Sequence, residues 1–353
     1  MTGSPAQGGS PAPGAQHGAQ EGAEHSAEQG TAHDAEQGTE HGAEHGARPG
    51  TRPALRLGTR ASALALAQSG MAAAALTAAT GRAVELVHIT TYGDTSREAL
   101  SQIGGTGVFV NALRDALYAG EIDFAVHSLK DLPTAKPEGL HLAAVTERAA
   151  VNDVLVARDG LKLADLPAGA KVGTGAARRT ALLRMLRPDL EVVPIRGNVD
   201  TRVGYVRSGR LDAVVLALAG LQRLGRADEA TEVFGPEVML PSPGQGALAI
   251  ECRDAELVPL LATLDDPLTR AAVTAERTML AVLEAGCSAP VGGHAAAVDD
   301  NVLSLTGLVA TVSGSAGLRL SAAGPIADAE GLGRRLAEAL LAEGAAELME
   351  REA

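Results

Sequence analysis

Residues 192–217 read VVPIRGNVDTRVGYVRSGRLDAVVLA, and the class of fold can be inferred from them. The two ends of this stretch, Val192–Ile195 and Ala213–Leu216, are short apolar runs that predict buried strands. Between them, Val199–Arg207 predicts a helix that Gly209 ends. A strand, a helix and a second strand in succession form the unit of a parallel or mixed sheet covered by helices. The stretch therefore predicts an α/β fold.

The same alternation of short apolar runs and longer helical stretches extends from Ala54 to Pro267. The predicted strands are Leu55–Leu57, Val84–Ile89, Asp123–Val126, Val154–Ala157, Val192–Ile195, Ala213–Leu216 and Ala247–Glu251. The predicted helices are Leu64–Ala79, Val108–Tyr118, Arg178–Leu186 and Val199–Arg207. This part of the chain is expected to be a doubly wound α/β body.

After Pro267 the order of elements changes. A long helix is predicted for Leu268–Leu283, followed by alternating runs around Asp299–Asn301 and a last helix from about Asp328 to Met349. That order predicts a small α+β domain with an antiparallel meander. Two further segments, Thr146–Asn152 and Pro236–Gln245, are typical of crossovers between lobes. A chain that passes twice between two lobes forms a cleft with paired hinges, which suits closure on a small anionic ligand.

The composition excludes several classes of function. With 46% hydrophobic residues in 353, the chain can bury two or three cores. A formal charge of -13 and only 2% aromatic residues disfavour binding to nucleic acid and to anionic membranes. Apolar runs such as Leu211–Leu218 are far shorter than the roughly 20 residues that cross a bilayer, so no membrane segment is expected. Two cysteines and the lack of a signal-like N-terminus predict a cytoplasmic protein.

Residues 1–50 form a low-complexity tail of Gly, Ala, Gln, Glu and His without Val, Ile, Leu or Phe. Such a composition predicts disorder. The five histidines of the tail lack the tight spacing of a zinc site, so no metal is expected there: His17, His25, His33, His41 and His45.

Charged residues follow several predicted strands, where open α/β sheets bind ligands. Arg60 follows the first strand and Asp131 the third. Arg178 and Arg179 stand at a probable helix start, where free N–H groups favour an anion. Arg196 and Arg202 bracket another strand-to-helix turn. Each of these arginines alone is typical of a solvated surface, but together they predict a polyanion cleft that contains one acidic residue.

The two cysteines differ in their surroundings, and one histidine stands beside Asp131. Cys252 lies in an alternating run and is interpreted as a small buried hydrophobic residue. Cys287 follows the end of a helix in a loop, where a thiol can be reached and deprotonated, although an inert loop cysteine is equally compatible with the sequence. His127 is interpreted as a hydrogen-bonded residue at a strand end.

Several segments, taken in order, resemble the porphobilinogen deaminase (hydroxymethylbilane synthase) family. The matching segments are GTRAS (58–62), HSLKDLP (127–133), RGNVDTR (196–202), AGLQRLG (219–225), GQGA (244–247) and LEAGC (283–287). The similarity extends from about Leu55 to the C-terminal helix and does not include the tail.

The resemblance implies two lobes of the type II periplasmic-binding-protein kind with mixed sheets, and a small C-terminal α+β domain with a three-stranded antiparallel sheet. The implied limits are 51–147 with 245–266 for domain 1, 148–244 for domain 2 and 267–353 for the cofactor-attachment domain. It further implies a monomeric transferase that adds four porphobilinogens, each losing ammonia, to a dipyrromethane cofactor held by a thioether to Cys287. Hydrolysis then releases hydroxymethylbilane.

By the same resemblance Asp131 is the catalytic carboxylate, which accepts the pyrrole N–H and stabilises the positive charge that develops there. Lys130 is the second catalytic residue that the resemblance implies, and it is expected to contact a carboxylate of the substrate. The implied cofactor-binding residues are Cys287, Arg60, Ser62, Lys130, Asp131, Thr174, Arg178, Arg179, Arg196, Gly197, Arg202, Arg223 and Gln245. Arginine suits this role because its planar fork matches the acetate and propionate carboxylates of each pyrrole.

The sequence departs from the family pattern at four positions. Gln102 and Thr106 stand where many relatives have lysine, and Gly175 and Ala176 stand where many have serine. The Gly-rich segment from about Tyr92 to Gly107 is expected to be a mobile lid. A non-enzymatic two-lobed anion-binding protein is the alternative, and the domain that carries Cys287 argues against it.

Overall fold

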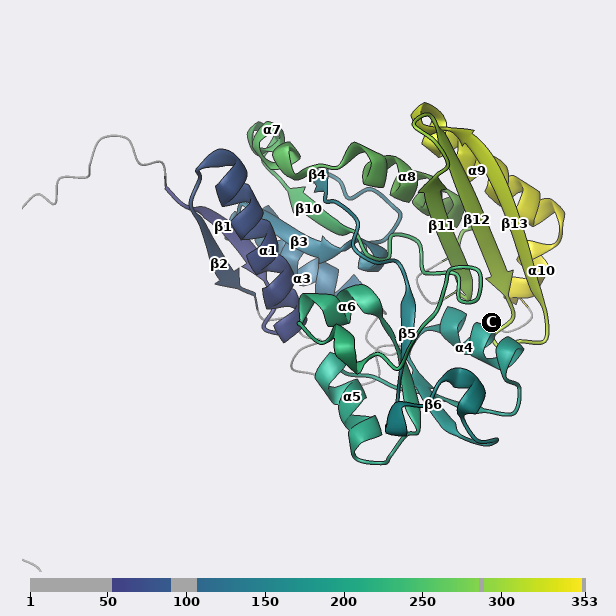
Figure 1. Cartoon of the computed structure of the whole chain (residues 1–353). Coiled ribbons are helices and arrows are strands. Elements are labelled where there is room, and N and C mark those ends of the chain that lie inside the picture. Colours follow the sequence, from purple (N-terminus) through teal and green to yellow (C-terminus); the bar gives the residue numbers. More distant parts are fainter. Residues whose placement is uncertain (1–52, 90–106, 286–288, 351–353) are drawn as a thin grey trace, which may run out of the picture. The chain divides into compact units, whose positions relative to one another are not determined.

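The structure is a computed structural model that describes residues 53–89, 107–285 and 289–350. The tail (1–50), residues 92–106 of the predicted lid and Cys287 lie outside the described residues. Within the described part the strands form two five-stranded sheets and one three-stranded sheet (Figure 1).

The first sheet combines parallel and antiparallel pairing. Its strand order is β2 (Val84–His88), β1 (Leu55–Thr59), β3 (Phe124–Ser128), β10 (Leu248–Cys252) and β4 (His141–Val145). β1 pairs in parallel with both β2 and β3, whereas β10 runs antiparallel to β3 and β4. β10 comes from a part of the chain that follows the whole second sheet, so it enters the first sheet through the second crossover.

The second sheet repeats this arrangement. Its strand order is β7 (Glu191–Pro194), β6 (Lys171–Thr174), β8 (Ala213–Ala217), β5 (Asp153–Ala157) and β9 (Glu232–Val233). β6 pairs in parallel with β7 and β8, and β5, the first strand after the first crossover, runs antiparallel to β8. Each lobe therefore receives one antiparallel strand from a crossover. This topology confirms the predicted type II two-lobed fold with mixed sheets.

The helices of the two lobes follow the strand ends. They are α1 (Ala63–Thr80), α3 (Gly107–Ala119), α4 (Ala177–Leu186), α5 (Val199–Arg207), α6 (Leu218–Arg223) and α7 (Val258–Leu261). α5 has the predicted bounds because Asn198 caps its first turn, accepting a hydrogen bond from the Thr201 backbone N at 2.9 Å. The strands β5 and β8 are buried along nearly their whole length, as expected for apolar central strands.

The expectation that no segment is long and apolar enough to cross a membrane requires a correction at α1. Its 18 residues have a mean hydropathy of 1.3, so by length and composition α1 could cross a membrane, contrary to the expectation from the apolar runs alone. In the structure α1 packs on the first sheet through Ala72 and Leu76. Two polar side chains on the same face, Gln68 and Ser69, are also buried, and Ser69 Oγ donates a hydrogen bond to Thr59 Oγ1 at 2.9 Å. These contacts make α1 a covering helix of the lobe.

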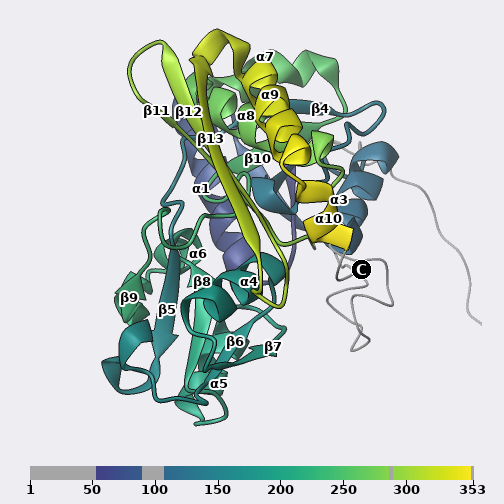
Figure 2. The same ribbon diagram turned by 90° about the vertical axis from the view of Figure 1, so that its right-hand side faces the viewer.

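The third sheet contains β11 (Val291–Ala297), β12 (Val302–Ala310) and β13 (Gly317–Pro325), all antiparallel. The helices α8 (Pro267–Val282) and α9 (Ala329–Ala342) pack against it (Figure 2). Gly293 and Gly307 face each other across β11 and β12, and a Cβ on either would lie within 2.7 Å of the Met279 side chain. Glycine at these two positions therefore lets α8 lie directly on the sheet, which confirms the predicted α+β domain.

The structure corrects several predicted elements. The last helix is not continuous, because Gly344 adopts a left-handed φ of 93° and separates α9 from α10 (Ala345–Glu350). The strands β4, β6 and β9 and the helices α6 and α7 were not predicted. The helices have only six and four residues, and the strands β6 and β9 only four and two, too short for a clear hydrophobic period. Other predicted ends differ from the observed ones by one or two residues.

Glu276 joins both crossovers to the C-terminal domain. Its carboxylate is fully buried and accepts hydrogen bonds from Arg148 Nη1 at 2.6 Å and Nη2 at 3.0 Å. It also accepts from the backbone N of Gly244 and of Ala295, both at 2.7 Å. Arg148 belongs to the first crossover, Gly244 to the second and Ala295 to β11. One ion pair thus holds three segments that are distant in sequence.

We expect Arg148→Ala to lower the free energy of unfolding by about 3–5 kcal/mol, because it leaves a buried carboxylate without its cation. Chemical denaturation monitored by circular dichroism measures this loss. Arg158→Ala is the matched control, since Arg158 pairs with Asp212 and Asp159 at the surface with 41% of its side chain exposed. The control should change stability by less than about 1 kcal/mol. Equal losses in the two variants would contradict the assigned role of the buried pair.

Candidate active site

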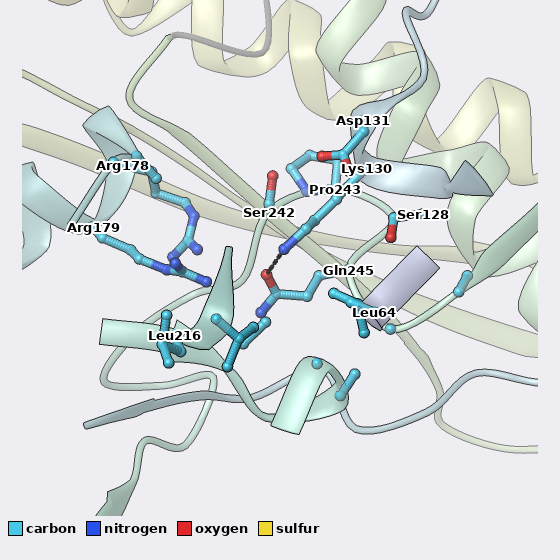
Figure 3. A pocket seen from close by; sticks show the side chains of 18 of the residues that line it. Leu64, Ser128, Lys130, Asp131, Arg178, Arg179, Leu216, Ser242, Pro243 and Gln245 are labelled. Carbon is cyan, nitrogen blue, oxygen red and sulfur yellow. Dashed lines mark hydrogen bonds between the residues drawn. The ribbon is translucent and has the colours of Figure 1, made fainter. Parts of the chain in front are cut away.

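A cavity of about 370 Å³ opens at the carboxyl ends of strands from both lobes. Its wall combines the segments after β3, β6, β7 and β8 with the second crossover and part of the C-terminal domain. Among the predicted site residues, those that line it are Lys130, Asp131, Arg178, Arg179, Gly197, Arg202, Arg223 and Gln245. Figure 3 labels five of them: Lys130, Asp131, Arg178, Arg179 and Gln245. Strand ends are where open α/β sheets bind ligands, so the cavity is the candidate active site.

Asp131 is the only acidic residue among the described residues that line this cavity. It ends the short 3-10 turn Leu129–Asp131 directly after β3. The turn is held firmly, because Leu129 is fully buried and its backbone N donates to Ala247 O at 3.0 Å. Arg277 of α8 donates to Leu132 O at 2.9 Å and to Pro133 O at 2.7 Å. The backbone that carries Asp131 is therefore fixed from two sides while the carboxylate remains exposed.

Lys130 is oriented by the second crossover. Its Nζ donates a hydrogen bond to Gln245 Oε1 at 3.2 Å, the contact drawn as a dashed line in Figure 3. The pKa of Lys130 is lowered to about 8: burial is the largest cause and the charges of Arg179 and Arg178 lower it as well, whereas Asp131 and Asp153 raise it. The Lys130 ammonium group is therefore mostly protonated at pH 7 and loses its proton as the pH rises through about 8.

Arg178 and Arg179 were predicted as cations of a polyanion cleft, and in the structure both are already paired with a carboxylate of the chain. Both are buried, and both donate to Asp153, from Arg178 Nη2 to Oδ2 and from Arg179 Nη2 to Oδ1, each at 2.7 Å. Arg178 also donates to Leu240 O, and Arg179 Nη1 donates to Val215 O at 3.1 Å. Figure 3 shows the two guanidinium groups lying close together beside the cavity. The sequence did not reveal Asp153, because a carboxylate at the start of an apolar strand has no local signature.

Arg202 and Arg223 complete the cationic wall. Arg202 Nε donates to Gly197 O at 2.8 Å, and Arg223 Nη2 donates to Gly246 O at 2.6 Å. Burial lowers the pKa of both arginines, and the charge of Arg179 lowers that of Arg202 further. Within the described part of the chain, the buried Nε atoms of Arg179 and Arg223 have no hydrogen-bond partner. Two arginines of the wall therefore each keep one buried donor unused within this part of the chain.

Five predicted site residues are not among the described residues that line the cavity. Ser62 caps α1, its Oγ accepting from the Ala65 backbone N at 3.3 Å. Thr174 is 1% exposed and its Oγ1 accepts from the Ala176 backbone N at 3.3 Å. Arg60 is half-buried after β1, and Arg196 is exposed. Cys287 lies outside the described residues, but Ala289, two residues later, lines the cavity.

Two further polar residues of the wall were missed by the sequence reading. Gln68 of α1 is buried, and its Nε2 donates to Ser128 Oγ at 2.9 Å. Both residues line the cavity beside Leu64. Ser128 could have been selected because it belongs to the HSLKDLP segment that contains Asp131. Gln68 could not, because a single glutamine in an apolar helix has no pattern of its own.

The structure also places the residues that were interpreted as structural. His127 is buried, and its Nε2 lies 3.1 Å from Glu251 Oε2, a carboxylate that Arg114 also binds at 2.8 Å. Cys252 is fully buried, and burial raises the pKa of its thiol to about 11. The prediction of a small buried cysteine is confirmed. For His127 the structure shows the short distance to Glu251, but within the described part of the chain its Nε2 makes no hydrogen bond.

Together the fold and the cavity define a class: a two-lobed body of the periplasmic-binding-protein type with a cavity lined by cations, extended by an α+β domain whose residues reach the site. Residues 55–258 match the family model "Porphobilinogen deaminase, dipyromethane cofactor binding domain", and residues 270–342 match "Porphobilinogen deaminase, C-terminal domain". The chain belongs to the porphobilinogen deaminase family, whose members are transferases.

Curated relatives agree with this assignment. Porphobilinogen deaminase 1 of Streptomyces coelicolor is 61% identical over 302 residues, which cover 82% of this chain and 95% of the relative. Porphobilinogen deaminase of Thermobifida fusca is 57% identical over 298 residues, 82% of this chain and 93% of the relative. The solved structure of the methionine binding protein MetQ covers 60% of this chain and 89% of its own, with 15% identity and a TM-score of 0.41.

Proposed function

We propose that this chain joins four molecules of porphobilinogen head to tail, with release of one ammonia for each, on a dipyrromethane that Cys287 holds through a thioether. Hydrolysis then releases hydroxymethylbilane. The observation that carries this proposal is the charge of the cavity: the five cations that line it, Lys130, Arg178, Arg179, Arg202 and Arg223, accompany the single lining carboxylate of Asp131 in the described residues.

The residues of the cavity suit an acidic pyrrole. Each pyrrole bears an acetate and a propionate, so a growing chain brings many carboxylates into the site. The cationic side chains that line the cavity offer the charge-assisted hydrogen bonds that such carboxylates need. We assign Arg60, Ser62, Thr174, Arg196 and Gly197 to carboxylate and backbone contacts at its margins, as the family pattern implies.

The proposed mechanism places one acid–base group among several positioning groups. When bound, the dipyrromethane supplies the pyrrole carbon to which the first substrate is joined. Loss of ammonia from porphobilinogen leaves an electron-poor methylene, and positive charge develops on the pyrrole nitrogen. The Asp131 carboxylate accepts the pyrrole N–H and stabilises that charge, and it can take up the proton lost after the new carbon–carbon bond forms. Lys130 holds a substrate carboxylate in place beside it.

We assign the domain limits as 51–147 with 245–266, 148–244 and 267–353. Strand membership supports these limits, because β1 to β4 and β10 belong to the first sheet, β5 to β9 to the second and β11 to β13 to the third. We further propose a cytoplasmic monomer that takes porphobilinogen as its substrate and acts without nucleic acid or a membrane.

The experiment that tests this function is intact-protein mass spectrometry during turnover. As isolated, the protein should exceed the mass of its sequence by one dipyrrole. Mixing it with less than four equivalents of porphobilinogen should add a ladder of species, each heavier than the last by one pyrrole unit. A protein without added mass that binds porphobilinogen reversibly would instead support the alternative, a non-enzymatic two-lobed anion-binding protein.

A further inference from the structure

Asp153 is a buried charge at the junction of the two lobes. It is the first residue of β5, where the chain leaves the first crossover, and it is 0% exposed. Burial alone would raise the pKa of its carboxyl group, but the charges of Arg178 and Arg179 outweigh burial and hold that pKa well below the ordinary value. Asp153 therefore carries a full negative charge at every pH at which the protein works, directly behind the cationic wall.

Gln245 connects this carboxylate to the other lobe. Its side-chain amide is buried, and Nε2 donates both to Asp153 Oδ1 at 2.8 Å and to Val151 O at 2.7 Å. Both amide hydrogens are thus used within the second lobe and the crossover, so the amide can have only one orientation. Its Oε1 must then point away from them, and it accepts the hydrogen bond from Lys130 Nζ at 3.2 Å.

We propose that Asp153 is a positioning residue, which lets Arg178, Arg179 and Lys130 share one cavity and, through the fixed amide of Gln245, sets the position and protonation of the Lys130 ammonium group. The chain of contacts runs from the two arginines to Asp153, then to Gln245 and to Lys130, the neighbour of Asp131. This proposal rests on the proposed function only where it names the anion that the cavity binds.

The charges that surround Lys130 are consistent with this arrangement. Burial and the cations Arg179 and Arg178 oppose its protonation, whereas Asp131 and Asp153 favour it, and its pKa is about 8 as a result. Asp131 is reserved for the substrate nitrogen in the proposed mechanism. Asp153, which no substrate can reach because it is fully enclosed, is then the permanent source of negative charge for Lys130.

The test measures the titration of Lys130 directly. The chain has only four lysines, Lys130, Lys136, Lys162 and Lys171, so competitive acetylation with acetic anhydride followed by peptide mass spectrometry resolves each one. In the holoenzyme the rise of Lys130 reactivity with pH gives the Lys130 midpoint, and the other three lysines serve as internal references. In Asp153→Asn the Lys130 midpoint should fall by roughly one pH unit, because a nearby opposite charge is lost.

The same variant should weaken substrate binding in a defined way. With Asp153 neutral, Arg178 and Arg179 repel each other and lose their common acceptor, so KM for porphobilinogen should rise by roughly tenfold. The alkaline limit of the activity profile should move to lower pH together with the Lys130 midpoint. A purely structural role for Asp153 would lower the stability and leave both quantities unchanged in the folded fraction.

The matched control and a second variant keep the test decisive. Asp212→Asn removes a carboxylate that lies directly before β8 of the same sheet and does not line the cavity. The Asp212 carboxylate accepts hydrogen bonds from Arg158 Nε and from the Lys171 backbone N, both at 2.7 Å. This variant should leave the Lys130 midpoint unchanged. If Asp153→Asn fails to fold, Gln245→Met retains the two Asp153 ion pairs and removes the amide that links Asp153 and Val151 to Lys130, and it should again lower that midpoint.

An unchanged Lys130 midpoint in Gln245→Met and in folded Asp153→Asn would overturn the proposal. This outcome is distinct from failure of the proposed function, because the acetylation readout needs no turnover. If the wild-type protein neither carried a dipyrrole nor consumed porphobilinogen, the function would fail while the effect of Asp153 on Lys130 could still be measured.

Discussion

Replacement of Asp131 by alanine is expected to lower kcat by roughly 10²- to 10⁴-fold, the usual contribution of a positioned acid–base group. Removal of the carboxylate leaves the positive charge on the pyrrole nitrogen without a counter-charge in the step that breaks the carbon–nitrogen bond. It is the single acidic group among the described residues of the cavity wall, so no neighbour on that wall can replace it. The measurement is the steady-state rate of product formation from porphobilinogen.

The variant should fold normally. The Asp131 side chain is exposed and takes no part in the hydrogen bonds that hold its turn, which come from Arg277 and from the Leu129 backbone N. The dipyrrole should remain attached, as intact mass would show. A loss of activity that followed a loss of the cofactor would assign Asp131 to assembly instead of turnover.

Two further variants separate charge from shape. Asp131→Asn retains the size and one acceptor oxygen but removes the charge, and it should be nearly as inactive as Asp131→Ala if charge stabilisation dominates. Asp115→Ala removes an exposed carboxylate of α3 that does not line the cavity, and it should leave kcat unchanged. A positioned acid–base group contributes at least roughly 10²-fold to the rate. If Asp131→Ala kept more than a few per cent of the wild-type kcat, the loss would be smaller than that and would exclude the proposed role.

The sequence predicted those elements whose signals are local. α5 has the predicted bounds because Asn198 and Gly209 lie at its ends, and the apolar run Ala213–Leu216 forms the buried strand β8 within one residue. The C-terminal helix was predicted as one element because its apolar period continues past Gly344. Gly344 adopts a left-handed conformation, the same helix-ending signal that Gly209 gives, and it was overlooked because the apolar period continues past it.

In the site, too, residues with a local sequence signal were predicted and residues that only the tertiary structure brings together were not. Lys130, Asp131 and Gln245 were selected because they stand in motifs, and the structure brings them together at one cavity. The partners of the arginines were not predictable. Asp153 is separated from Arg178 by 25 residues, and only the sheet and the crossover bring its carboxylate beneath α4. This contact depends on the tertiary structure. It shows that Arg178 and Arg179 are paired with a buried carboxylate of the chain instead of being free cations of the cleft.

Replacement of Cys287 by serine is expected to yield a protein without the dipyrrole and without measurable turnover. A thiolate is the attacking group that forms a thioether, and a serine hydroxyl remains protonated and is far less nucleophilic near neutral pH. The neighbouring Ala289 lines the cavity, so the chain on one side of Cys287 borders the cationic wall. Intact mass should equal that of the substituted sequence, and porphobilinogen should add no ladder of heavier species.

Cys252→Ser provides the matched control within the same molecule. The Cys252 thiol is fully buried in β10, and its pKa is raised to about 11, so it stays protonated and unreactive. A hydroxyl in its place should cost roughly 1–3 kcal/mol of stability, because it buries a polar group in an apolar core. The dipyrrole should nevertheless remain attached. If Cys287→Ser retained the added mass, or if Cys252→Ser lost it while folded, the attachment site would be elsewhere, and the cavity would have to hold its cofactor through the arginines alone.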